Sequence, residues 1–234
     1  EKAGFYYLGD DWKINYRKEG NHRAKKYWGP AKWISRLIAQ FPFVRGIMIS
    51  GSLSKGFMNK NADIDYFIIT KPGRLWVCRT FLILFKKIFL LNSYKLFCLN
   101  YFIDAENLEI DDKNLYTATE LITLQATYNE RLYKQLMATN DWVQHYYPNH
   151  PANNHVSSPK KQHSWLKTAL EKLLNGHLGR KLDDYFMRKT TNHWKQKFKS
   201  ENPEAGNSSL KSRKHISKQN SFDFQQFVLQ SYKK

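Results

Sequence analysis

The chain has 234 residues, of which 41% are hydrophobic and 15% aromatic, and its formal net charge is +18. This length allows one large domain or one core with smaller appendages, and the hydrophobic content is enough for a sizeable core. The charge excess is spread along the whole chain. It therefore favours anionic partners in general, such as nucleotides, RNA or a membrane surface, but does not mark one basic groove.

The two cysteines, Cys78 and Cys98, form no CxxC pair, and no Cys/His cluster has the spacing of a zinc site. We expect reduced thiols in a cytoplasmic protein, because no signal peptide is visible. The chain begins with Glu1, so we expect it to be a fragment of a longer protein. The most apolar run, residues 75–91, contains Arg79, Lys86 and Lys87. Three charges argue against a membrane span, so this run is predicted to be a buried amphipathic helix.

The first elements are a hairpin and a helix. Residues 5–18 resemble two short strands around a Gly-Asp-Asp turn. This hairpin could be a small edge hairpin or the wing of a truncated winged helix that contacts DNA. Residues 21–40 have helical spacing, which Pro30 is expected to interrupt.

The middle of the chain alternates between strands and helix. Residues 44–49 are a short run rich in β-branched residues, which predicts a buried strand. A glycine-containing loop follows at 51–56, a second strand at 64–70, the apolar helix at 74–91 and a third strand at 96–103. This order predicts an α+β fold with a small mixed sheet flanked by helices.

The second half is predicted to be mainly helical. Apolar residues recur at helical intervals over 116–147 and again over 165–198, where Gly176 and Gly179 interrupt the pattern. Residues 200–220 are polar and predict a mobile linker, and residues 222–232 could form a short last helix.

Four segments follow from this pattern. Residues 1–33 hold the hairpin and the start of the first helix, and residues 34–115 hold the core of the sheet. Residues 116–200 form the helical region, and residues 201–234 form the linker with its short helix.

The loop between the first two strands has the chemistry of a phosphate site. Gly51 lets backbone N–H groups approach phosphate oxygens without an intervening Cβ atom. Ser52 and Ser54 supply hydroxyl groups, and Lys55 supplies a cation. We therefore expect Gly51, Ser52, Ser54 and Lys55 to bind a nucleotide.

Two carboxylates follow the loop. Asp63 and Asp65 are two residues apart at the start of the second strand, so their side chains are expected to face the same way. Neighbouring carboxylates repel each other, and a shared divalent cation relieves the repulsion. Carboxylate oxygens are the ligands that Mg²⁺ prefers. Asp63 and Asp65 are therefore predicted to bind Mg²⁺.

The unit from Ile47 to Thr70 resembles the nucleotidyltransferase fold of the DNA polymerase β superfamily. Members of that superfamily show an apolar strand, then Gly-Ser, then a loop, then Asp-x-Asp on the next strand; Gly51, Ser52, Asp63 and Asp65 match these positions. The stretches PFVRGIMISGSLSKG and ADIDYFIITKPGRLW also look like a group of uncharacterised bacterial proteins with a nucleotidyltransferase domain. The resemblance implies metal-dependent transfer of a nucleotide, but it names no acceptor.

The resemblance also implies a third carboxylate on the third strand, where this chain departs from the pattern. Asn100 occupies the usual position, and an amide cannot act as a base. Asp104 lies four residues further on, and even spacing would place it on the same face as Asn100. Asp104 could therefore replace the missing carboxylate as a catalytic residue, or it could be a solvated residue at the strand end.

Two functions are expected from these residues. The first is a Mg²⁺-dependent nucleotidyltransferase, which transfers a nucleoside monophosphate from a nucleoside triphosphate to a hydroxyl group of a small molecule, a nucleic acid or a protein. Asp63, Asp65 and Asp104 would be its catalytic residues. The alternative is a catalytically inactive regulator on the same fold that binds nucleotide or nucleic acid, as Asn100 and the positive charge suggest.

Overall fold

The structure is a computed structural model, and it describes residues 4–6, 12–90, 95–150, 164–201, 210–219 and 224–232. One sheet of six strands organises these residues, in the order β4-β1-β2-β3-β6-β5. The strands are β1 (Val44–Ser50), β2 (Asp65–Thr70), β3 (Cys98–Asp104), β4 (Gln125–Tyr128), β5 (Leu210–Arg213) and β6 (Ile216–Gln219). Only β2 and β3 pair in parallel, and every other pair of neighbouring strands is antiparallel.

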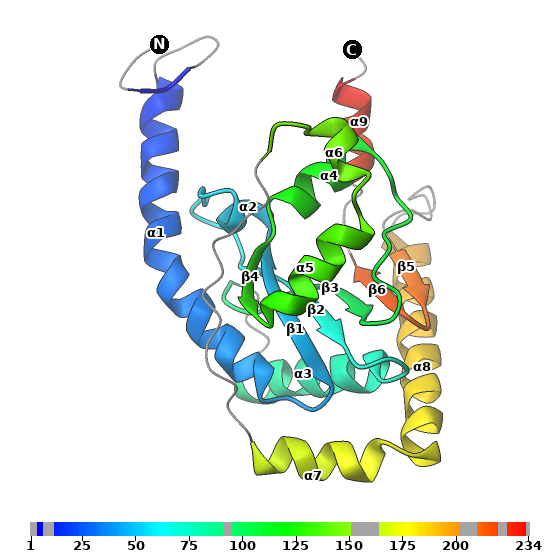
Figure 1. The fold of residues 1–234 in the computed structure, drawn as a ribbon. Coiled ribbons are helices and arrows are strands. Elements are labelled where there is room, and N and C mark those ends of the chain that lie inside the picture. Colours follow the sequence, from blue (N-terminus) through cyan, green and yellow to red (C-terminus); the bar gives the residue numbers. More distant parts are fainter. Residues whose placement is uncertain are drawn as a thin grey trace.

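Nine helices are present among the described residues (Figure 1). They are α1 (Trp12–Ala39), α2 (Gly51–Ser54), α3 (Leu75–Phe89), α4 (Leu115–Ile122), α5 (Glu130–Thr139), α6 (Val143–Tyr146), α7 (Trp165–Leu174), α8 (His177–Glu201) and α9 (Phe224–Tyr232). The predicted α+β fold is confirmed, with a mixed sheet flanked by helices and a mainly helical C-terminal part. In the parts of the chain that the structure describes, no helix has both the length and the apolar character needed to cross a membrane.

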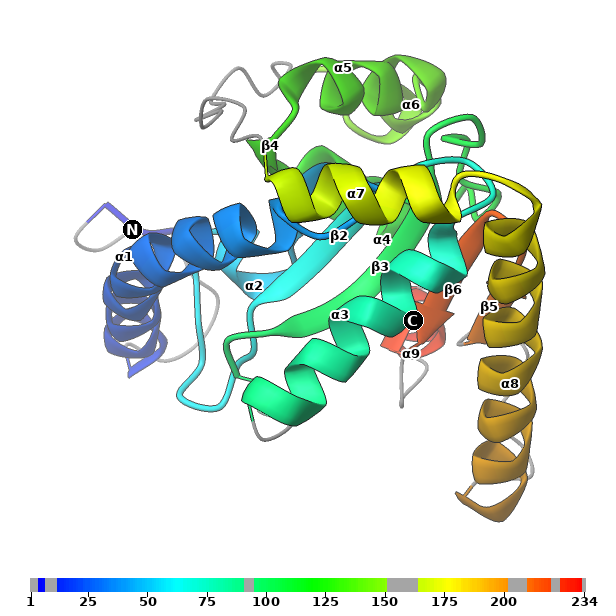
Figure 2. The same cartoon turned by 90° about the horizontal axis from the view of Figure 1, so that it is seen from below.

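The sheet separates two hydrophobic cores, because alternate residues of each strand face opposite sides. On one side, Ile47, Tyr66 and Phe102 pack against α1 and α3. On the other side, Met48 and Phe67 pack against α4, α5 and α6. Figure 2 shows α3 and the pair α5 and α6 on opposite sides of the sheet. Burial on both faces fixes the register of the central strands, and therefore the position of the residues at their ends.

The first helix is longer than the sequence predicts. The hairpin expected over residues 5–18 falls partly on residues 7–11, which lie outside the described part, and residues 12–18 are helical rather than extended. Ile14, Ala24 and Ile34 are buried, so that tertiary packing extends the helix toward the N-terminus. Pro30 does not end α1, although the helix bends near its middle in Figure 1, as expected where a backbone donor is lost.

The outer strands come from segments that the sequence assigns to other structures. β4 lies inside the region predicted to be helical, and β5 and β6 lie inside the predicted linker. β4 pairs with β1, and β6 pairs with β3. The same sheet therefore takes strands from three of the predicted segments, residues 34–115, 116–200 and 201–234.

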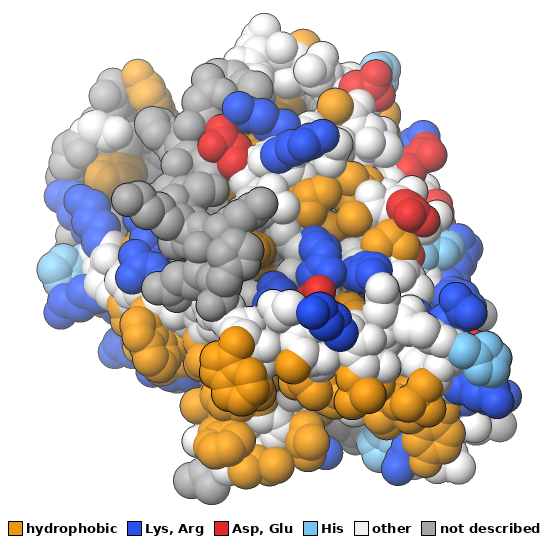
Figure 3. All heavy atoms as spheres, turned by 60° about the horizontal axis from the view of Figure 1, so that its bottom comes forward, with side chains coloured by type: hydrophobic (Ala, Val, Ile, Leu, Met, Phe, Trp, Pro, Cys, Tyr) orange, Lys and Arg blue, Asp and Glu red, His pale blue; other side chains and the backbone are white. Residues whose placement is uncertain are grey.

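Large hydrophobic side chains remain at the surface beside the helical C-terminal part. Figure 3 shows them as a band across the lower part of the face on which it looks. The large exposed hydrophobic residues of α1, α3, α7 and α8 are Tyr16, Trp33, Leu84, Ile88, Phe89, Trp165, Leu166, Leu173, Leu178 and Tyr185. Apolar surface of this kind is where proteins associate with other surfaces.

Candidate functional site: the loop after β1 and its carboxylates

The loop after β1 begins at a glycine that no other residue can replace without strain. Gly51 has φ +67°, a backbone conformation that side chains disfavour. A Cβ atom at this position would lie 2.2 Å from Oδ2 of Asp65. Gly51 is therefore required both by its backbone conformation and by the close approach of the Asp65 carboxylate.

The N-terminal half of α1 supports this loop from outside. The Met58 N–H donates to the carbonyl of Gly20 at 3.0 Å, and Nε of Arg23 donates to the Met58 carbonyl at 2.9 Å. The ring of Phe57 lies where a Cβ atom of Gly20 would be. The loop is thus fastened to α1 as well as to the sheet, although the two are far apart in the sequence.

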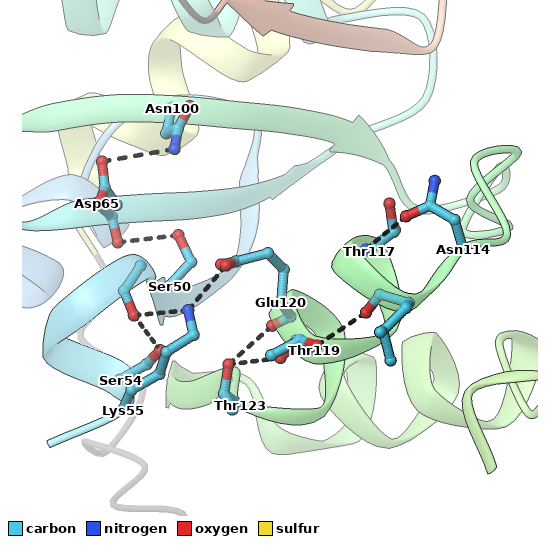
Figure 4. A network of polar contacts seen from close by, with 12 residues as sticks. Ser50, Ser54, Lys55, Asp65, Asn100, Asn114, Thr117, Thr119, Glu120 and Thr123 are labelled. Atoms are coloured by element: carbon cyan, nitrogen blue, oxygen red, sulfur yellow. Dashed lines mark hydrogen bonds and ion pairs between the residues drawn. The ribbon is translucent and has the colours of Figure 1, made fainter. Parts of the chain in front are cut away.

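Asp65 is the first residue of β2, a central strand of the sheet. Its neighbours across the strands are Ser50 of β1 and Cys98 of β3. The Cys98 thiol donates a hydrogen bond to its carboxylate, and the Asn100 amide lies 3.5 Å from Oδ1 (Figure 4). Burial, together with the negative charges of Asp63 and Glu120, raises the pKa of Asp65 to about 6, although the hydrogen bond from Cys98 and the charge of Lys55 lower it.

Asp63 lies just before β2, in an extended segment whose next residue, Ile64, is fully buried. Its charge acts on Asp65, on Cys98 and on Lys86 of α3. The charge of Asp63 is thus felt by Asp65 and by its neighbours, although Asp63 itself lies outside the strand. Burial lowers the pKa of Lys86 and raises that of Cys98.

Lys55 lies at the end of the loop and connects it to α4. Its Nζ donates to the Gly51 carbonyl at 3.0 Å and to Oε1 of Glu120 at 2.8 Å. Both side chains of the ion pair are 30% exposed, so water can reach them. Figure 4 shows the Glu120 carboxylate pointing from α4 toward Lys55 and the loop. The hydroxyl of Ser54 donates to the same Gly51 carbonyl at 2.9 Å, and Ser52 is half-buried.

Asp104 lies at the other end of β3 and has a different role. It pairs with Thr70 while Cys98 pairs with Asp65, so five residues of strand, about 16 Å, separate it from the Asp65 position. One of its carboxylate oxygens accepts from the backbone N–H groups of Glu106 and Asn107, and from the Asn107 side chain. Asp104 holds the turn after β3, and the structure does not bring it to Asp63 and Asp65.

A bulge explains why even spacing fails between Asn100 and Asp104. Leu99 pairs with Tyr66 and Tyr101 with Phe67, so Asn100 is an extra residue in β3. An extra residue reverses the alternation of side chains along a strand. Asn100 consequently points toward Asp65, while Asp104 ends on the other side of the pleat.

A half-open pocket adjoins this group of residues. It lies between the sheet and α4, a buried lysine from β6 is part of its lining, and its polar groups are mostly neutral hydroxyl and amide groups. Its lining residues are Ser50, Phe67, Asn100, Tyr101, Ile110, Tyr116, Thr117, Glu120, Leu121, Leu124 and Lys218. Ser50 and Asn100 also contact Asp65, so the pocket opens beside that carboxylate.

Four of the residues around Asp65 and the adjoining pocket cannot be assigned from the sequence. Cys98 and Lys86 sit in apolar segments, where they look like core residues. Glu120 and Lys218 come from segments predicted to be a plain helix and a linker. What they share is their place at the site or at the pocket beside it, which only the tertiary structure supplies.

The two aspartates near the loop suit a magnesium ion that is also bound by a substrate. Among the described residues, no group of three or more His, Cys, Asp or Glu side chains could hold a metal on its own. Mg²⁺, however, is commonly bound through one or two carboxylates together with substrate phosphates and water. Asp63 and Asp65 supply two such carboxylates, and a cation would stabilise the ionised form of Asp65, whose pKa is raised first by burial and then by the charges of Asp63 and Glu120.

Comparisons of the chain with protein-family models, with curated proteins and with solved structures found no match.

Proposed function

We propose that the protein is a Mg²⁺-dependent nucleotidyltransferase. The observation that carries the proposal is the Asp65 carboxylate, which is held against Gly51 where the loop meets the sheet and is repelled by Asp63 and Glu120. A site that concentrates carboxylates beside a glycine loop and a lysine is suited to a metal-bound triphosphate. The resemblance of the Gly-Ser loop and the Asp-x-Asp pair to the DNA polymerase β superfamily supports the same function.

Each residue has a role in this reaction. Asp63 and Asp65 would hold Mg²⁺, which when bound supplies electrostatic stabilisation of the charge on the phosphates. Lys55 and the hydroxyl groups of Ser52 and Ser54 would bind the triphosphate over the loop. An acceptor hydroxyl would attack the α-phosphorus, and the bond to pyrophosphate would break. The protein contributes mainly the in-line positioning of these groups.

The test is nucleotide transfer in the presence of Mg²⁺. The protein is incubated with each of the four NTPs labelled at the α-phosphate, and pyrophosphate release and labelled products are measured. Loss of one metal ligand removes several kcal/mol of stabilisation, so Asp65→Asn is expected to reduce the rate at least about 100-fold. Asp141→Asn, at an exposed position, is the matched control and should keep the wild-type rate. Consumption of no NTP, or equal rates for wild type and Asp65→Asn, would contradict the proposal.

A second candidate is a catalytically inactive regulator that binds nucleic acid, and α1 favours it. The helix carries one acid, Glu19, beside eight basic residues, most of them exposed: Lys13, Arg17, Lys18, Arg23, Lys25, Lys26, Lys32 and Arg36. Such a helix next to the loop suits a phosphate backbone. This candidate predicts RNA binding that weakens steeply with salt, with no turnover of NTP. Fluorescence anisotropy with a labelled RNA between 50 and 200 mM salt, roughly the range over which such contacts are screened, measures it.

A further inference from the structure

Glu120 is the acidic group nearest to the loop outside the Asp-x-Asp pair. It comes from α4, whose start is fixed by the Asn114 side chain accepting from the Thr117 N–H. Its carboxylate binds Lys55 at 2.8 Å, and its charge acts on Asp65. A third carboxylate is thus present at the loop, against Lys55 and within electrostatic range of Asp65, although β3 carries Asn100.

Glu120 also faces the pocket beside Asp65. It lines that pocket with Ser50, Asn100, Tyr116 and Thr117, whose neutral hydroxyl and amide groups suit the hydroxyl groups of a ligand. The rest of its lining is mostly apolar. The pocket is closed on one side by the sheet and on another by α4, which suits a small molecule better than a nucleic acid strand or a folded protein.

The contact between Lys55 and Glu120 keeps both groups occupied when no substrate is bound. The Lys55 ammonium is also the cation closest to the Gly51 loop, where it donates to the Gly51 carbonyl. A triphosphate on this loop would carry more negative charge than one carboxylate and would attract Lys55 away from Glu120. Release of Glu120 would then follow from nucleotide binding.

We propose that Glu120 supplies the carboxylate missing from β3, and that the pocket it lines takes a small hydroxyl-bearing acceptor. This inference rests on the proposed nucleotidyltransferase function. In the reaction, the acceptor O–H bond breaks and its proton passes to the Glu120 carboxylate. The acceptor oxygen forms a bond to the α-phosphorus, and the bond from that phosphorus to the pyrophosphate oxygen breaks, so that pyrophosphate leaves. No oxidant or further reactant is needed.

Two measurements on Glu120→Gln separate the roles of this residue. Binding of the imidodiphosphate analogue of ATP with Mg²⁺ is measured by calorimetry, and it should be equal to wild type or several-fold tighter, because Lys55 no longer has a charged partner to leave. Transfer of labelled AMP from ATP to compounds in a whole bacterial extract, whose small molecules and macromolecules are separated after the reaction, should fall by about 10² to 10⁴ for loss of a general base. Glu130→Gln, which breaks an exposed ion pair with Lys134, is the matched control and should change neither quantity.

A second variant tests the pocket without touching the loop. Thr117→Phe places a larger side chain in the pocket and should leave binding of the ATP analogue unchanged while transfer falls at least about tenfold, by loss of acceptor positioning. Wild-type turnover by Glu120→Gln, or label found only on macromolecules, would overturn this inference while loss of activity in Asp65→Asn still supports the proposed function. Absence of nucleotide binding and transfer in the wild-type protein would instead refute both.

Discussion

The site residue Asp65 is expected to lower the stability of the folded protein at neutral pH. Its pKa in the folded state is about 6, against an ordinary value of 3.8 for an aspartate side chain. At 1.36 kcal/mol for each pKa unit, a shift of about two units corresponds to a cost of about 3 kcal/mol at most. Because the side chain is partly exposed to solvent, the expected cost of the ionised carboxylate is about 1–3 kcal/mol.

The pH dependence of this cost has a definite sign. Since the pKa is raised in the folded state, the folded protein binds more protons than the unfolded chain between about pH 4 and pH 6. The contribution of Asp65 to stability is therefore greatest below pH 4 and is lost as the pH rises through 6. Asp65→Asn removes the titrating group but keeps its size, and it should stabilise the protein by about 1–3 kcal/mol at pH 7.5. At pH 4.5 the gain should shrink to about a third.

Urea unfolding followed by tryptophan fluorescence at these two pH values measures the difference. Asp141→Asn, at an exposed position, serves as the control and should change the free energy of unfolding by less than about 0.5 kcal/mol. A variant Asp65→Asn that is less stable than wild type at pH 7.5, or whose gain is the same at both pH values, would refute the reasoning that this carboxylate is repelled and poorly solvated.

Three further substitutions test the framework around the site. Gly51→Ala should lower the free energy of unfolding by about 1–2 kcal/mol more than Gly56→Ala, because both residues have positive φ but only Gly51 faces a neighbouring carboxylate. Thermal unfolding compares the two variants, and equal losses of stability would contradict the close approach of Asp65 to Gly51. Asp183→Ala should cost about 2–4 kcal/mol, because its buried carboxylate accepts from two N–H groups at the start of α3; an unchanged urea midpoint would contradict this. Glu171→Gln should lower the free energy of unfolding by about 1–2 kcal/mol, because it weakens the two hydrogen bonds that the Arg45 guanidinium donates to the Glu171 carboxylate. This loss of stability should be larger at low salt, and a loss independent of salt would argue against the ion pair.

The central strands could be predicted because burial on both faces leaves a clear mark in the sequence. β1 is a short run rich in Val, Ile and Met, and β2 is a short run rich in Tyr, Phe and Ile. The apolar helix α3 follows a Pro-Gly turn. Their order alone indicates an α+β sheet. The spacing of Asp63 and Asp65 after Gly51 likewise indicates two neighbouring carboxylates beside the loop; the structure brings Asp65 against Gly51, and the charge of Asp63 acts on Asp65.

The outer strands and the first helix could not be predicted, because tertiary contacts decide them. β4 has four residues and lies between two helices, so its pattern is lost in the helical spacing around it. β6 is polar in sequence, yet it pairs with β3 and buries Ile216 and Ser217. Residues 12–18 carry a strand-like sequence after a turn signal, but packing of Ile14 and the contacts of the loop with α1 favour a helix.

Asp104 illustrates how a local irregularity changes a functional prediction. Even spacing places it beside Asn100 only if β3 is regular, and the bulge at Asn100 breaks that rule. No residue type near position 100 announces the bulge. The acidic residue that does contact the loop, Glu120, is far in sequence from Asp63 and Asp65. It can be assigned to the site only from the tertiary structure, in which α4 packs over the sheet.

The most direct test of the account measures metal binding that depends on the triphosphate. Mn²⁺ replaces Mg²⁺, and its binding is followed by electron paramagnetic resonance with and without the imidodiphosphate analogue of ATP. We expect Mn²⁺ bound by the protein to rise sharply when the analogue is present, and to fall back toward the level without analogue in Asp63→Asn and in Asp65→Asn. Equal Mn²⁺ binding by wild type and both variants in the presence of the analogue would contradict the claim that these two carboxylates form the metal and nucleotide site.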